Sequence, residues 1–241
     1  MNLKETRLFT TPIAHRGLHD EETPENSLAA YRKAIGKGYP IELDVRIIDD
    51  GNVIVLHDDT LGRMTGTDGY ASNLRIADLD NLRLGGTDEK IPTFIQALEL
   101  VNGQVPLLIE TKTTGKAGAL ESKLHDLLKN YSGEFALQSF DPYSMEYFRK
   151  HAPDYVRGLL SFPDVGQDFS FCKRRALQKL KVTRICDPHF LSYGHWALPN
   201  KYVARKNLPT LAWTVRSNSE YEKVQAYCDN IIFEGFSPEK A

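Results

Sequence analysis

The sequence has few cysteines, no long hydrophobic run and no excess of charge of one sign. Its cysteines, Cys172, Cys186 and Cys228, include no CxxC pair. Neither a disulfide framework nor a cysteine zinc site is therefore expected, and a reducing compartment fits best. Thirty basic against thirty-two acidic residues leave a net charge of −2, so no global field recruits nucleic acid or an anionic membrane.

Hydrophobic segments of the length that targeting or membrane insertion requires are also missing. The N-terminal stretch MNLKETRLFTTPIAH lacks the apolar run of a signal peptide, and no later segment approaches ~18 apolar residues. These absences predict a cytoplasmic protein without stable membrane association. With 241 residues, of which 41% are hydrophobic, the chain can bury one large core, so residues 1–241 are expected to form a single domain.

Short apolar, β-branched runs recur along the chain, each followed by a polar turn and a segment of helical periodicity. Most of these runs place apolar residues at consecutive positions, as strands covered on both faces do. The eight runs are 12–17, 41–48, 105–111, 134–140, 156–161, 182–188, 209–215 and 230–236.

Helical periodicity fills the gaps between the runs. In the first gap, Leu28, Tyr31 and Ile35 form an apolar stripe that Gly36 or Gly38 ends. The later candidates are 93–101, 117–130, 142–150, 171–180, 194–206 and 219–228. Eight strands alternating with helices predict a (β/α)8 TIM barrel, and a doubly wound open sheet is the competing architecture.

One interval breaks the alternation of strands and helices. An Asp50-Gly51 turn joins two apolar runs and indicates an antiparallel hairpin. Residues 58–92 are then rich in Gly, Asp, Thr and Asn, and we interpret them as an insertion after the second strand. Its apolar content is too low for a separate domain.

Carboxylates stand near the carboxyl ends of the second and third predicted strands, the end that carries the active site in a barrel. Glu42 and Asp44 are two residues apart, so both point to the same face. Glu110 holds the corresponding place on the next strand. Three converging carboxylates repel one another unless a cation lies among them, and an all-oxygen set suits one hard divalent ion, Mg²⁺ or Ca²⁺.

Cationic and titratable side chains are predicted at the same barrel end. Arg16 and Lys112 supply positive charge suited to phosphate oxygens, and His15 and His57 can act as general acid and base. A metal, two cations and two histidines around one anionic centre predict phosphodiester cleavage. Each feature alone also fits a turn or a salt bridge, but burying inward carboxylates without a function is costly.

Several longer motifs resemble those of the glycerophosphodiester phosphodiesterase family. They are HRGLHDEETPENSLAAY, IELDVRIIDDGNVIVLHDDTLGRMTG, IPTF, LLIETK, LQSFD and AWTV, which together span nearly the whole chain. The resemblance implies a barrel of the phospholipase-C-like phosphodiesterase type, with 58–92 as the family's insertion. It also implies that His15 and His57 are the catalytic pair. By the same likeness Glu42, Asp44 and Glu110 hold the metal, and Arg16 and Lys112 contact phosphate.

The resemblance supplies the expected reaction. A small-molecule glycerophosphodiester, such as glycerophosphocholine or glycerophosphoethanolamine, would be hydrolysed to glycerol 3-phosphate and an alcohol. The nucleophile is either water or the neighbouring glycerol hydroxyl, and either histidine can be the base. Two other interpretations remain: a lysophospholipase D acting on lipid substrates, and a catalytically silent barrel that binds a phosphorylated ligand.

Three further side chains are candidates for the substrate pocket. Phe140 and Trp213 end predicted strands and can form an apolar wall against the glycerol or the leaving alcohol, although both also fit a core role. Glu25, in the TPENS segment, falls on the family motif next to the site. The sequence leaves the oligomeric state open.

Overall fold

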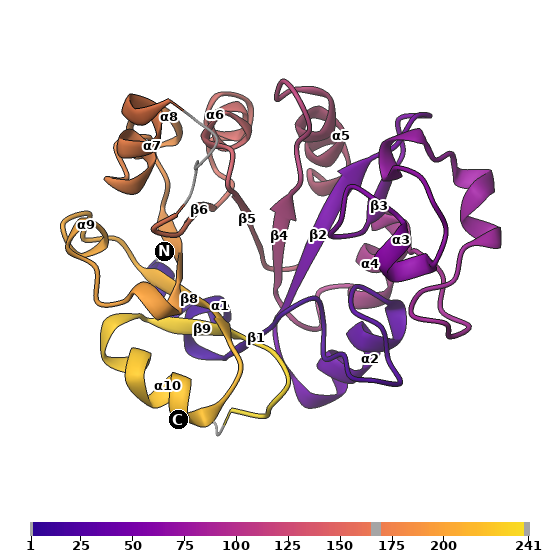
Figure 1. Cartoon of the computed structure of the whole chain (residues 1–241), viewed down its shortest axis with the longest axis horizontal. Helices are drawn as coiled ribbons and strands as arrows, with labels where there is room; N and C mark the ends of the chain where they lie inside the picture. Colours follow the sequence, from indigo (N-terminus) through magenta and orange to yellow (C-terminus); the bar gives the residue numbers. More distant parts are fainter. Residues whose placement is uncertain (1, 165–169, 239–241) are drawn as a thin grey trace. The chain divides into compact units, whose positions relative to one another are not determined.

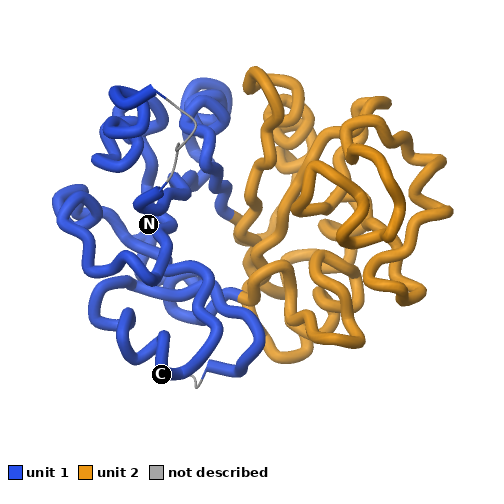
Figure 2. The backbone as a smooth tube through the Cα atoms, in the orientation of Figure 1, with its two compact units in different colours: residues 1–13, 136–241 blue, residues 14–135 orange. Residues whose placement is uncertain are grey.

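A computed structural model describes residues 2–164 and 170–238 of the chain. These fall into two compact units, one of residues 1–13 with 136–241 (unit 1) and one of residues 14–135 (unit 2), coloured separately in Figure 2. Every residue proposed above to bind metal or phosphate or to transfer a proton belongs to unit 2.

Parallel strands form the centre of unit 2. β2 (Ile41–Ile47) pairs in parallel with β4 (Leu107–Thr111), and Ala14 of the short β1 (Ile13–Ala14) pairs with Ile41. All but the last residue of β2 are buried, as predicted for a strand covered on both faces. Polar residues on such a strand must be paired or bind something, because burial removes their hydration.

The predicted hairpin is confirmed. β3 (Val53–Val55) runs antiparallel to the end of β2, with Val45 opposite Val55. Gly51 turns the chain with a φ of +77°, a left-handed conformation that glycine adopts without steric cost.

Two of the longer helices in unit 2 begin at side-chain caps that the sequence supplies. Ser27 caps α2 (Leu28–Lys37) by accepting a hydrogen bond from the Ala30 amide, and Gly38 ends the helix at φ +72°. Thr93 and Gln96 form a reciprocal capping box at the start of α4 (Phe94–Val101). α2 packs against α4, and α5 (Ala119–Leu128) follows β4 along the chain (Figure 1).

The segment after β3 contains only short helices. They are α3 (Gly62–Thr65), η2 (Ala71–Asn73) and η3 (Ile76–Asn81). Its buried leucines, among them Leu61, Leu79 and Leu84, form one hydrophobic cluster with Ile54 and Leu56 of the hairpin. The insertion is thus fastened to β3 by a shared core.

Unit 1 repeats the parallel pattern. β5 (Phe135–Ser139), β6 (Arg157–Ser161), β7 (Phe190–Gly194), β8 (Thr210–Val215) and β9 (Asn230–Phe233) pair in that order, each parallel to the next. The helices and 3₁₀ turns of this unit are η1 (Leu3–Glu5), α1 (Arg7–Thr10), α6 (Pro142–His151), α7 (Phe171–Gln178), α8 (Thr183–Cys186), η4 (His195–Ala197), α9 (Lys201–Ala204), α10 (Asn218–Val224) and η5 (Gln225–Tyr227).

One predicted strand is wrong. Residues 182–188 contain α8, and the strand that aligns with Gly158 and Leu159 of β6 is β7, a few residues later. Asp187 takes a left-handed conformation at the helix end, and Pro188 follows, which prevents the helix from continuing.

Strands and helices thus alternate through both units, with neighbouring strands parallel apart from the β2–β3 hairpin. This is the predicted (β/α)8 barrel, with the hairpin and the segment after it as the insertion. Sequence positions at the carboxyl ends of the strands are where such a fold carries its site.

Candidate active site

Buried carboxylates form the centre of the site. Glu42 and Asp44 of β2 are each 1% exposed, and Glu110 of β4, which pairs with Asp44 across the strands, is 6% exposed. One carboxylate oxygen from each of the three lies within 4.8 Å of those from the other two. The structure therefore brings together the three residues predicted as metal ligands.

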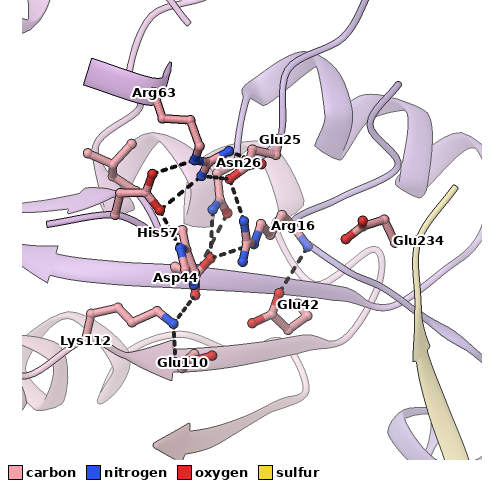
Figure 3. A network of polar contacts seen from close by, with 12 residues as sticks. Arg16, Glu25, Asn26, Glu42, Asp44, His57, Arg63, Glu110, Lys112 and Glu234 are labelled. Carbon is pink, nitrogen blue, oxygen red and sulfur yellow. Dashed lines mark hydrogen bonds and ion pairs between the residues drawn. The ribbon is translucent and has the colours of Figure 1, made fainter. Parts of the chain in front are cut away.

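Two cations lie against these carboxylates (Figure 3). The Lys112 ammonium is 3.0 Å from Oδ1 of Asp44 and also contacts Glu110. The Arg16 backbone amide donates to Oε2 of Glu42 at 3.0 Å, while its guanidinium Nε lies 3.4 Å from Oδ2 of Asp44. Both predicted phosphate-binding residues thus share the site with the carboxylates.

Electrostatics divide the carboxylates into two kinds. Burial, together with repulsion from Asp44, raises the pKa of Glu42 well above its usual value and that of Glu110 to a lesser degree. Burial also acts on Asp44, but Lys112 and Arg16 outweigh it and hold the pKa of Asp44 well below its usual range. The neighbouring cations therefore offset the cost of burying a negative charge at Asp44 but not at Glu42. A hard divalent cation would supply the missing positive charge, because all three side chains offer oxygen ligands.

The central carboxylate is held by the amide that follows Glu25 in the TPENS segment, a position that from the sequence fits either the site or a helix cap. Asn26 donates from Nδ2 to Oδ2 of Asp44 at 2.9 Å, and the hydroxyl of the fully buried Tyr31 donates to Oδ1 of Asn26 at 3.0 Å. Ser27, not Asn26, caps the helix. Asn26 and Arg16 both have left-handed backbones, at φ +57° and +54°, a conformation that non-glycine residues hold mainly where the surrounding structure fixes it.

His57 follows β3 and is fixed through its neighbour. Its Nδ1 lies 2.6 Å from Oδ1 of Asp58, which leaves Nε2 as the nitrogen available for proton transfer. Burial lowers the pKa of His57, and Lys112 and Arg16 act in the same direction while Asp44 opposes them. A neutral imidazole near pH 7 can accept a proton.

Arg63 of the insertion was missed from the sequence, where it reads as one more exposed cation. Its Nε lies 2.5 Å from Oδ2 of Asp58, and that bond lowers the pKa of Asp58 to about 2. Its other two nitrogens donate to both oxygens of Glu25, at 2.7 and 2.9 Å. Arg63 and Glu25 are 38 residues apart, so local sequence patterns do not predict this contact.

Glu25 connects the two arginines. Its Oε1 accepts from Arg16 at 2.7 Å and from Arg63 at the same distance. Burial raises the pKa of Glu25, but the arginines outweigh it and the net shift is downward. Glu25, predicted as a pocket residue, is therefore a bridging carboxylate in the structure.

Other predicted residues are placed as follows. His15 directly follows β1 and is half-buried in unit 2. Phe140 and Trp213 lie in unit 1 with ring centroids 5.5 Å apart, in an aromatic cluster that also includes Phe162 and Trp196. Their pocket role stays a prediction.

A cavity of about 190 Å³ opens beside Lys112 in unit 2. Its lining residues are Arg46, Ile47, Asp59, Tyr70, Ser72, Lys112 and Thr114. The carboxylate cluster thus has open space next to one of its two cations.

A model of the Glycerophosphoryl diester phosphodiesterase family matches residues 15–234, which include all of the residues just described. The chain belongs to this family. It is therefore an enzyme of the phosphoric diester hydrolase class, as the sequence predicted.

Relatives in this family include bacterial and mammalian proteins. A glycerophosphodiester phosphodiesterase of Caldanaerobacter subterraneus subsp. tengcongensis is 33% identical over 165 residues, which cover 63% of this chain and 66% of that protein, just under two thirds. The lysophospholipase D GDPD1 of Mus musculus is 30% identical, with 93% of this chain and 82% of that protein covered.

The fold is shared with solved structures. A phosphodiesterase of Oleispira antarctica, in complex with the product sn-glycerol-3-phosphate, superposes with a TM-score of 0.78 over 95% of this chain and 94% of that one, at 23% identity. This likeness confirms the barrel. Within residues 2–164 and 170–238, no helix has the length and apolar composition needed to cross a membrane.

Proposed function

We propose that the chain catalyses the metal-dependent hydrolysis of glycerophosphodiesters, such as glycerophosphocholine and glycerophosphoethanolamine, to glycerol 3-phosphate and an alcohol. The observation that carries the proposal is the cluster of three buried carboxylates with Lys112 and Arg16 against it. An anionic phosphodiester approaching such a cluster needs additional positive charge there, and a divalent cation supplies it.

Glu42, Asp44 and Glu110 are the proposed ligands of that cation, Mg²⁺ or Ca²⁺. When bound, it would polarise a phosphoryl oxygen and balance the negative charge of the cluster. Lys112 and Arg16 already neutralise Asp44, so the cation is needed most at Glu42, whose pKa burial and like charges raise.

Arg16 is a proposed phosphate ligand. Its Nε lies 3.4 Å from Oδ2 of Asp44, and its Nη1 donates to Oε1 of Glu25 at 2.7 Å. These two carboxylates fix the orientation in which the guanidinium would meet a phosphate. Lys112 would act as a point charge toward the phosphoryl oxygens.

His57 and His15 are the proposed proton-transfer pair. One takes the proton of the nucleophile as the new P–O bond forms, and the other gives a proton to the alkoxide as the old P–O bond breaks. The order of the two roles stays open. If the neighbouring glycerol hydroxyl attacks, a cyclic phosphate forms and water later opens it, whereas direct attack by water produces none. Phosphorus NMR on a time course distinguishes these routes.

The test is release of glycerol 3-phosphate, coupled to its dehydrogenase, from several glycerophosphodiesters. The wild type should release it from at least one of them, and His57→Ala and His15→Ala should release it far more slowly. His151→Ala is the matched control, because His151 is exposed on α6 in unit 1. No release from any head group would contradict the proposal.

Two further arms test the other expectations. Faster alcohol release from a lysophospholipid than from every glycerophosphodiester would replace the proposed substrate class.

Phe140 and Trp213 are proposed to form an apolar wall for the glycerol or the leaving alcohol. Trp213→Ala should therefore change the KM values for different head groups to different extents. The cytoplasmic location stays a prediction, which cell fractionation tests.

A further inference from the structure

We infer that Arg63 is a positioning residue through which the insertion fixes two working groups of the site at once, His57 through Asp58 and Arg16 through Glu25. The inference rests on the proposed function and extends it to a residue outside the strand ends. It follows from a continuous set of charge-assisted hydrogen bonds inside unit 2.

The geometry of Arg63 differs from that of an ordinary surface ion pair. One edge of its guanidinium, Nε with a terminal nitrogen, contacts both oxygens of Asp58 at 2.5 and 3.1 Å. The terminal nitrogens contact both oxygens of Glu25 at 2.7 and 2.9 Å. Two bidentate contacts from one planar group fix both carboxylates in orientation as well as in distance, which a single ammonium cannot do.

Both carboxylates face inward toward groups that would touch substrate. Asp58 is the partner of Nδ1 of His57, so its orientation sets the direction of the imidazole. Glu25 shares Oε1 between Arg63 and Arg16. Without Arg63, Glu25 would bind Arg16 alone and compete more strongly with a phosphate for that guanidinium.

The insertion is rigid enough to serve in this way. Arg63 lies on α3, between Leu61 and Met64, which are both buried in the core shared with the hairpin. The half-exposed arginine, 47% accessible, thus extends from a fixed base to the site, as Figure 3 shows.

Removal of Arg63 should therefore change both kinetic constants. Misoriented His57 lowers kcat, and the released Glu25 raises KM, with a combined loss in kcat/KM of about 10- to 100-fold, the range usual for residues that orient a site's ligands. Arg63→Lys should recover little, because it reaches one carboxylate. Arg75→Ala is the matched control: Arg75 also belongs to the insertion and pairs with Asp49 at 3.0 Å, with no contact to the set above.

The deciding experiment is a double-mutant cycle of Arg63→Ala and Asp58→Asn on glycerol 3-phosphate release, with melting temperatures to verify folding. If Arg63 acts on His57 through Asp58, the double variant loses no more kcat than the worse single variant. Millimolar guanidinium should partly restore Arg63→Ala and leave Arg75→Ala unchanged. Kinetics of Arg63→Ala equal to those of Arg75→Ala, or losses in kcat that multiply, would overturn the inference.

A readout without turnover separates this inference from the proposed function. The ¹⁵N chemical shifts of the His57 ring report whether Nδ1 is bonded to Asp58. They should change in Arg63→Ala and stay as in the wild type in Arg75→Ala. An inactive wild type refutes the proposed function, whereas unchanged His57 shifts in Arg63→Ala refute the positioning role.

Discussion

Replacing Glu42 with glutamine removes one buried negative charge while it keeps the size of the side chain. The oxygen that accepts from the Arg16 amide at 3.0 Å is retained in the amide group. Carboxylate oxygens of the cluster lie within 4.8 Å of one another, and two unit charges at that separation repel by about 3.5 kcal/mol at an effective dielectric constant near 20. Since Lys112 and Arg16 offset part of this repulsion, the free energy of unfolding without metal should rise by about 1–2 kcal/mol.

The pH dependence has a defined sign. The pKa of Glu42 is raised in the folded state by burial and by Asp44 and Glu110, so folding favours its protonated form. Its contribution to stability is complete below the unfolded pKa near 4.5 and is lost as the pH rises through the raised value. The cation-free wild type should therefore lose stability from pH 5 toward pH 8, and Glu42→Gln should lose less.

A divalent cation should reverse this difference. At about 100 times its dissociation constant, a ligand that binds only the folded chain adds about 2.7 kcal/mol, and for this length each kcal/mol raises Tm by about 2–4 °C. The wild type should thus gain about 5–11 °C with the preferred ion, and Glu42→Gln much less. Thermal melts at several pH values, with EDTA, Mg²⁺ or Ca²⁺, measure all of this. Equal cation responses in the two proteins, or a less stable cation-free variant, would refute the reasoning.

Four other substitutions test separate parts of the site. His57→Ala and His15→Ala should each lower kcat by about 10²- to 10⁴-fold with an unchanged Tm, as steady-state kinetics and melts will show. Lys112→Met leaves two buried carboxylates without their shared cation, and urea titration without metal should show a loss of about 3–5 kcal/mol. Tyr31→Phe removes a hydroxyl that donates inside the core and should cost about 1–2 kcal/mol in the same assay. An unfolded His57→Ala, or wild-type stability in either of the last two variants, would contradict these assignments.

The sequence predicted the strands that carry the site better than it predicted their neighbours. β2 and β4 are long apolar runs interrupted only by charged residues, so their limits and facing side chains follow from period-two geometry. The run 182–188 is less apolar, and its hydrophobic residues, Val182, Ile185 and Cys186, have a spacing that fits a helix as well as a strand. Pairing with β6 and β8 selected the later segment, β7, and this pairing is non-local.

In the candidate site, too, local features could be predicted from the sequence and non-local contacts could not. Glu42, Asp44 and Glu110 could be found because residues at strand ends converge in any barrel. The contacts of Asn26 and Arg63 could not be predicted, because they depend on how the loops after β1 and β3 fold back over the strands. The contact of Asn26 with Asp44 spans 18 residues, and no local pattern encodes it.

The most direct test of the account is to measure bound metal and turnover on the same sample. The cation-free protein is titrated with Mg²⁺ or Ca²⁺ while glycerol 3-phosphate release from glycerophosphocholine is followed. We expect no release with EDTA and full release at one ion per chain, with Glu42→Gln needing far more of the ion. Full turnover in EDTA, or metal bound equally well by Glu42→Gln, would contradict the claim that these carboxylates hold a cation required for hydrolysis.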